Sequence, residues 1–376
     1  MASYGLHERR LVIGLDYGTT FTGVAFATPY GRTCTLEEID AVAEWGAQMD
    51  NLEKVPSVIS YSAPTIAMEQ QWGSSLSPNA TAMVHTKLEL DPSSLSDEMD
   101  LVLQSLDGMK NLNFRHIKGA IGFNGVPAYT YKSPEEIVTD YLAKVFQYLL
   151  KVVEGFSYEL RSTISTDIVV TIPTGWSYSA MNSTFRALTN AGFNQSYFPR
   201  LRDVIFVTES EAAAIYTARY LKSQLGREFL KVDESFVLCD AGGGTVDVVS
   251  YTVTQLNPSL QLEKLGEPTG RKCGSVFINM HFKKWLRDHI GEANYKMLDP
   301  NMEENKISSH SVEGKAMREL MKEFDDQKQR FDGEMKEDIR IDLPHPLQHL
   351  SIAGKVNKGE IAIPWQVNFA DLIFTN

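Results

Sequence analysis

The sequence predicts an α/β protein made of two similar lobes around a cleft. Two stretches, residues 11–27 and 236–253, share one pattern: an apolar strand ends in an aspartate, a Gly-Thr turn follows, and a second apolar strand returns. A repeated pattern of this kind indicates a duplicated fold. Strand-like and helix-like segments follow one another along the rest of the chain, as in α/β proteins. A chain of 376 residues has room for two or three domains.

The second stretch has the residues of a phosphate-binding turn. Three glycines, residues 242–244, lie between the predicted strands, where glycine lets the backbone approach a ligand and exposed N–H groups bind anions. Thr245 lies in the same turn, and Asp240 and Asp247 flank it. Carboxylates beside a phosphate need a cation between them, and Mg²⁺ binds one or two carboxylates together with phosphate oxygens. The alternative is an ordinary hairpin with a flexible turn.

The first stretch supplies the matching half of such a site. Gly18, Thr19 and Thr20 form its turn, and Asp16 stands at the end of its first strand. A buried aspartate without a partner is costly, so a cation or donor must lie nearby unless Asp16 caps its own turn. Two such hairpins predict two lobes that clasp one nucleotide from opposite sides. The sequence has no G-x-x-x-x-G-K-[ST] loop, which excludes a P-loop ATPase.

Three segments together resemble the actin-like ATPase superfamily, and within it the nucleotide-binding domain of the heat shock protein 70 chaperones. Residues 13–20, IGLDYGTT, are similar to the first phosphate motif of that family, and residues 240–247 to the second. Residues 207–214, VTESEAAA, resemble its Glu-Pro-x-Ala-Ala-Ala motif, with Ser210 in place of proline. The resemblance covers nearly the whole chain, although the middle and the C-terminal third are divergent. It implies the duplicated ribonuclease H-like fold and Mg²⁺-dependent binding of ATP or ADP, with or without hydrolysis.

The resemblance also implies roles for individual residues. Asp16 and Asp240 would hold hydrated Mg²⁺, while Glu209 and Asp247 would orient the attacking water, with Lys87 as an electrostatic aid. The phosphate cradle would consist of Gly18, Thr19, Thr20, Gly242, Gly243, Gly244 and Thr245. Lys87 matches the family as a single residue without a flanking motif, and a lysine in a polar loop is usually solvated.

Two further positions complete the implied nucleotide site. Gly274 lies in a turn that opens a helix, where unpaired N–H groups form a general anion site. In the family a glycine at this place lies beside the nucleotide. Lys328 and Arg330 are the candidates for the lysine and arginine that sandwich adenine. The alternative is that the charged segment 303–336 forms a solvated helix pair.

Local patterns predict the remaining elements in chain order. Residues 55–61 form a short strand, and residues 91–110 an acidic surface loop leading into a short helix. Residues 133–151 form a helix with Ser133 as N-cap and Pro134 at its first position. Strands at 166–173 and 203–207 enclose a helix at 179–191, and Glu209 stands on a loop before an Ala-rich helix that ends at 225. A link at 226–233, a helix at 277–289 and short strands at 351–353 and 360–363 follow. Lobe I spans residues 1–228, with an inserted subdomain at about 41–126, and lobe II spans 229–376.

Composition narrows the choice of partners. A net charge of −12 and a pI near 5.2 argue against nucleic acid, which needs a basic surface. The three cysteines are scattered, and Cys239, in a predicted buried strand, is interpreted as a small apolar residue. No secretory signal and no run of 18 apolar residues is visible, so no membrane is expected and the default location is the cytoplasm or nucleus. The expected partners are a nucleotide and, within a longer chain, co-chaperones or client proteins.

Two other functions use the same fold: a sugar or acetate kinase, and a pseudo-ATPase or actin-like structural protein that binds nucleotide as a clamp. The Glu209 motif favours the chaperone branch. Members of the resembled family carry a further strand and a Gly-Gly turn after the charged helices, and no Gly-Gly pair follows Gly244 here. The second lobe is therefore expected to be incomplete on the adenosine side, with weakened nucleotide affinity and an exposed edge strand.

Overall fold

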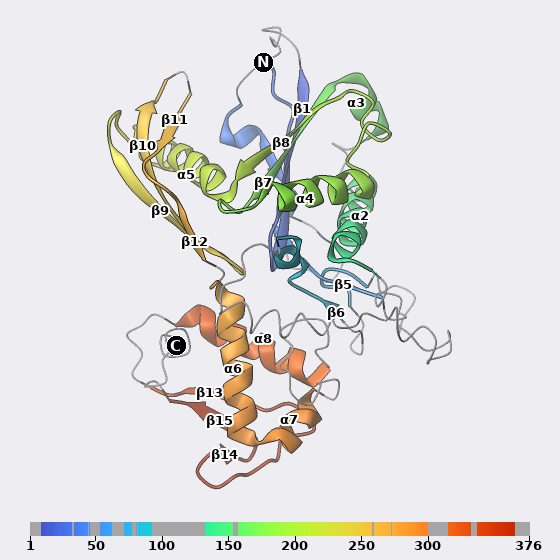
Figure 1. Cartoon of the computed structure of the whole chain (residues 1–376), viewed down its shortest axis with the longest axis vertical. Coiled ribbons are helices and arrows are strands. Elements are labelled where there is room, and N and C mark those ends of the chain that lie inside the picture. Colours follow the sequence, from blue (N-terminus) through green and yellow to red (C-terminus); the bar gives the residue numbers. More distant parts are fainter. Residues whose placement is uncertain are drawn as a thin grey trace.

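The computed structural model describes residues 9–31, 34–43, 45, 53–61, 71–76, 80, 82–91, 132–152, 157–257, 259–271, 273–299, 315–331 and 337–364. Three parts follow one another along the chain: a mixed sheet with helices packed on it, an antiparallel sheet, and a helical body with a small sheet (Figure 1). The predicted α/β class is confirmed. Most of residues 41–126, where an inserted subdomain and an acidic loop are predicted, lies outside the described residues.

The first sheet holds the first predicted hairpin. Its strands run in the order β3-β2-β1-β7-β8, with β4 also paired to β2. β1 pairs antiparallel with β2 and parallel with β7, and β7 pairs parallel with β8. The bounds are β1 (Arg10–Tyr17), β2 (Phe21–Ala27), β3 (Ile39–Ala41), β4 (Lys54–Pro56), β7 (Ser165–Ile172) and β8 (Leu201–Thr208). Alternate residues of β1 are buried, so its apolar side chains enter the core while Asp16 remains partly exposed.

Helices complete the core of this first part. α2 (Pro134–Val152) and α4 (Tyr178–Ala191) pack together, and their apolar residues share one cluster with those of β1 and β7. Ser133 and Glu136 exchange side chain–backbone hydrogen bonds of 3.3 and 2.7 Å, a capping box that starts α2 where it was predicted. α3 (Tyr158–Thr163), η2 (Thr86–Leu90) and the strand pair β5 (Ile59–Ser60) and β6 (Ala82–Met83) complete this part.

The second sheet is built around the strand β10, which pairs antiparallel with three neighbours. They are β9 (Ser235–Ala241), β11 (Gln261–Lys264) and β12 (Thr269–Arg271), and β10 itself spans Val246–Gln255. Within the described residues, β9 pairs with β10 alone. Its alternate residues face outward, and Val237 is 66% exposed. The prediction of a strand at 236–240 is correct, but the prediction of its burial is wrong: Cys239 is exposed because this face of the edge strand is left uncovered.

One helix contacts both sheets. α5 (Glu209–Leu225) contacts β7 and β8 of the first sheet and β9 and β10 of the second (Figure 1). Thr208 caps its N-terminus and forms a capping box with Glu211. Glu209 is therefore the first residue of the helix rather than part of a preceding loop.

The third part has a separate core. It contains α6 (Ser275–Ile290), α7 (Glu292–Leu298), α8 (Lys315–Arg330), β13 (Ile339–Asp342), β14 (Val356–Asn357) and β15 (Glu360–Ile363). Phe282 of α6 and Phe324 of α8 are fully buried and stack with ring centroids 3.9 Å apart. The predicted strand at 360–363 is confirmed, whereas the one at 351–353 is reduced to a single bridge between Ile352 and Val356. Of the charged segment 303–336, the structure describes residues 315–331, and α8 spans nearly all of them.

Candidate functional site

The two predicted phosphate turns have the same closure. The N–H of Gly18 donates to the carbonyl of Phe21 at 3.0 Å, and the N–H of Gly242 donates to the carbonyl of Thr245 at 2.9 Å. Each turn therefore joins its strands through a hydrogen bond between residues three apart. The resemblance between the two stretches in sequence extends to this local geometry.

The two turns also touch each other. A Cβ atom on Gly243 would lie 2.6 Å from Oγ1 of Thr20, and one on Gly244 would lie 2.6 Å from Oγ1 of Thr19. Real Cβ atoms do not approach an oxygen so closely, so the threonines of the first turn occupy the space that the glycines of the second leave open. The fold thus brings together two segments that are far apart in the chain.

The second turn is fastened to the start of α6. All three of its glycine carbonyls, at residues 242–244, accept hydrogen bonds from the first N–H groups of this region: Gly274 and Ser275, at 3.1 Å each, and Val276, at 2.9 Å. A Cβ on Gly274 would lie 2.5 Å from the carbonyl oxygen of Gly243. The prediction that these N–H groups are unpaired and offer an anion site is therefore wrong, because the hairpin itself uses them. Gly274 instead allows the helix and the turn to pack closely.

Asp16 lies beside the first turn with both carboxylate oxygens engaged. Lys54 Nζ donates to its Oδ2 and Thr171 Oγ1 donates to its Oδ1, both at 2.8 Å. Strand pairing explains the first contact: Asp16 on β1 pairs with Gly23 on β2, and Gly23 pairs with Lys54 on β4. Because Gly23 has no side chain, Lys54 extends across it. Lys54 belongs to none of the sequence motifs, since only the pairing of β4 with β2 brings it to Asp16. Thr171 lies on β7, which pairs in parallel with β1 and so places its hydroxyl beside Asp16.

The pKa of Asp16 falls below its usual value. Burial raises it, but the opposite charge and hydrogen bond of Lys54, the charge of Lys87 and the hydroxyl of Thr171 together outweigh that effect. Asp16 is therefore an ionised carboxylate held by a protein cation.

Lys87 and Glu209 form an ion pair. Lys87 Nζ lies 2.5 Å from Glu209 Oε1, and the Lys87 side chain is only 3% exposed. The ammonium also lies 5.5 Å from the ring centre of Trp176 and 6.0 Å from that of Tyr17. The alternative that Lys87 is a solvated loop lysine is wrong, because η2 packs against α2 and α4 and carries Lys87 inward.

Asp240 and Asp247 are direct partners on β9 and β10. Directly paired residues point to the same face of a sheet, so the two carboxylates lie side by side. Burial, and then the charges of Glu209 and Asp16, raise the pKa of Asp240. Burial, and then the charges of Glu209 and Asp240, raise the pKa of Asp247 to about 6. Asp16, beside the first turn, thus raises the pKa of Asp240, beside the second turn, so the carboxylates of the two turns interact electrostatically.

Asp247 also has a hydrogen-bonding capacity that the described residues leave unused. It is only 2% exposed, and its Oδ2 is buried without a hydrogen-bond partner in the described part of the chain. On the far side of β10 it faces Gly270, where a Cβ would lie 2.3 Å from its Oδ1. A buried carboxylate oxygen without a donor is costly, and a bound water or cation would relieve it.

The balance of charges fits a divalent cation. Four carboxylates, those of Asp16, Glu209, Asp240 and Asp247, interact with two ammonium groups, those of Lys54 and Lys87. The surplus of negative charge agrees with the raised pKa values of Asp240 and Asp247, and a hydrated Mg²⁺ would offset it. The described residues contain no group of three or more His, Cys, Asp or Glu side chains that could hold a metal.

Lys328 lies near the site but is bonded elsewhere. Its Nζ donates to Oδ1 of Asn279 at 2.7 Å and to Oδ1 of Asp325 at 2.6 Å. Asn279 is one helical turn along α6 from Ser275, so Lys328 lies close to the end of α6 that holds the glycine turn. Arg330, at the end of α8, is exposed. Neither is bonded to the charged cluster, and an adenine-binding role for them stays a prediction.

Comparison of the chain with models of protein families and with curated proteins finds no match. Among the described helices, none is both long enough and apolar enough to cross a membrane.

Proposed function

We propose that this chain is a nucleotide-binding module of the heat shock protein 70 type, with the duplicated actin-like fold, which binds ATP or ADP together with Mg²⁺. The observation that carries the proposal is the contact between the two turns, Thr19 and Thr20 against Gly243 and Gly244. Two turns with the same closing hydrogen bond, far apart in the chain, meet beside a cluster of carboxylates. That arrangement suits a ligand that carries several phosphates and a cation.

Each group in the cluster has a chemical task in this proposal. The hydroxyls of Thr19 and Thr20 and the backbone of the glycine turn would bind phosphate oxygens. Asp240, and Asp16 once Lys54 releases it, would bind waters of Mg²⁺, which neutralises phosphate charge when bound. Glu209 and Asp247 would orient a water, and Lys87 would hold Glu209 in position. Because the turns touch each other, a phosphate lodged between them has to move them apart.

The second candidate is a nucleotide clamp without turnover, a pseudo-ATPase. Two ion pairs favour it. Lys54 already neutralises Asp16, and Lys87 engages the Glu209 carboxylate that would orient water. A protein with these pairs intact can hold phosphates while its acidic groups remain occupied. Phosphate release under single-turnover conditions separates this candidate from an ATPase.

Nucleotide binding is tested by calorimetry on the full chain, with ATP and ADP in the presence of Mg²⁺ or of EDTA. Asp240→Ala is expected to weaken binding in Mg²⁺ much more than binding in EDTA. Asp203→Ala, which removes an exposed aspartate on β8, is the matched control and should change neither affinity. Absence of binding of either nucleotide at millimolar concentration would refute the proposal. The same resemblance makes co-chaperones and client proteins the partners to test next.

A further inference from the structure

A cavity lies at the opposite end of α5 from Glu209. Its volume is about 610 Å³, within the range of small-molecule sites. Its walls come from four parts of the chain: the last turns of α5, the segment between α5 and β9, the segment that includes the start of η1 (Leu36–Glu38), and the connection between β10 and β11. The cavity is therefore lined by α5 and by segments that connect the strands of each sheet.

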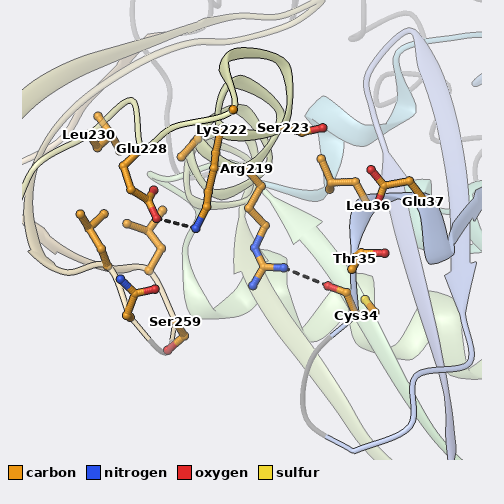
Figure 2. A pocket seen from close by; sticks show the side chains of 15 residues that line it. Cys34, Thr35, Leu36, Glu37, Arg219, Lys222, Ser223, Glu228, Leu230 and Ser259 are labelled. Carbon is orange, nitrogen blue, oxygen red and sulfur yellow. Dashed lines mark hydrogen bonds and ion pairs between the residues drawn. The ribbon is translucent and has the colours of Figure 1, made fainter.

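The walls combine leucine side chains with one cation. Leu36, Leu230, Leu256 and Leu260 line the cavity, and the half-buried Arg219 lies among the polar residues (Figure 2). Four leucines around a guanidinium favour a ligand with an apolar body and an anionic end, since apolar surface gains from burial and the charge selects orientation.

Arg219 keeps its charge available for a ligand. Its Nη1 donates to the backbone carbonyl of Cys34 at 3.1 Å, a neutral acceptor. In the described part of the chain, no carboxylate forms an ion pair with Arg219. An arginine has five N–H donors in a planar fork that matches a carboxylate, and the single bond to Cys34 leaves the others for a ligand.

The other charges of the cavity limit the ligand to one negative charge. Lys222 is paired with Glu228, so neither adds to the local charge (Figure 2). Glu37 is exposed, and its pKa is lowered first by a hydrogen bond to its own backbone N–H and then by the hydroxyl of Thr35, so it remains an anion. Among the described residues that line the cavity, Arg219 is the one unpaired cation that would compensate a polyphosphate facing this carboxylate. A monoanion needs only the guanidinium.

We infer that this cavity binds an amphipathic organic monoanion, such as a medium-chain or aromatic carboxylate. Its carboxylate pairs with Arg219 and its apolar body lies against the leucines. A ligand in this place contacts α5 and the connections between strands of each sheet, and its binding to the folded chain also raises the thermal stability.

Decanoate and decanol are suitable probes, because they share an apolar chain and differ in charge. Calorimetry on the full chain should show decanoate binding more tightly than decanol. Arg219→Gln should weaken decanoate binding about tenfold to a hundredfold, the size of a lost charged hydrogen bond, and should leave decanol unchanged. Arg227→Gln removes the same charge from a nearby exposed residue that does not line the cavity, and should have no effect.

Two further measurements locate the bound probe. Ser223→Trp places a large ring on an exposed residue of α5 that lines the cavity, and should abolish binding of both probes while circular dichroism stays unchanged. Decanoate should slow the alkylation of Cys34, which lines the cavity, and leave the exposed Cys239 on β9 reacting at its original rate. Decanoate binding that survives both Arg219→Gln and Ser223→Trp, or no binding of decanoate at millimolar concentration, overturns the inference.

Discussion

Lys54 occupies a place at Asp16 that a metal ion would otherwise share, and Lys54→Met tests what that ammonium does. The pair is separated by 2.8 Å, and 55% of the Lys54 side chain is exposed. A unit pair with charge centres about 4 Å apart is worth about 1 kcal/mol in water and about 4 kcal/mol at a partly buried site. The exposure of Lys54 places this pair in the lower part of that range, at about 1–2 kcal/mol.

Without Lys54, nucleotide phosphates would meet an uncompensated Asp16 unless Mg²⁺ is present. The ratio of the Kd in EDTA to the Kd in Mg²⁺ should therefore rise about five- to thirtyfold in Lys54→Met, at ~1.4 kcal/mol per decade. Lys54→Arg keeps the cation and should keep the wild-type ratio. Calorimetry on all three proteins measures both constants. An unchanged ratio in Lys54→Met would show that Lys54 does not substitute for the metal. That result would not contradict the proposal that the chain binds nucleotide.

Three other outcomes are expected. Asp247→Asn should stabilise the protein at pH 7 by about 3 kcal/mol. The pKa of Asp247 near 6 in the folded protein exceeds its unfolded value, so the wild-type protein loses this stability as the pH rises from about 4 to 7 and the variant does not. Urea unfolding should show that the difference in stability between the two proteins vanishes at low pH. Lys87→Met should destabilise by about 2–4 kcal/mol, as expected for a buried pair that loses one partner, and adding Glu209→Gln should recover most of that loss; additive effects would mean that the two side chains are not coupled. Glu209→Gln alone should reduce any ATP turnover while largely sparing nucleotide affinity, and an equal loss of both would assign Glu209 a structural role.

The strands and helices were accessible from sequence because local patterns determine them. Ser133 and Pro134 predict the start of α2, and the burial of every second residue of β1 follows from the alternation of apolar residues in its sequence. The repeated motif predicts two turns that face one ligand, and the structure places these turns in direct contact with each other. These features depend on residues that are neighbours in the chain or on a direct repeat.

Features that depend on the pairing of distant strands were not accessible. Lys54 reaches Asp16 only because β4 pairs with β2 in a register that sets Lys54 opposite Gly23. The residues around Lys54 do not predict that register. Cys239 is exposed because one face of β9 is solvent-accessible. The apolar sequence of β9 does not indicate which of its faces is covered. The hydrogen bonds that occupy the N–H groups at Gly274 likewise require the position of the glycine turn relative to α6.

The attachment of the glycine turn to α6 has a mechanical consequence. Three carbonyls bonded to the first N–H groups of a helix make turn and helix a single stiff body. α6 has 16 residues and is therefore about 24 Å long. A tilt of about 5° at the turn displaces the far end of such a helix by about 2 Å, and the core around Phe282 travels with it. A phosphate that pushes the two turns apart would therefore tilt α6, and a small movement at the turn would become a larger movement at the far end of α6, at the surface of the third part of the molecule.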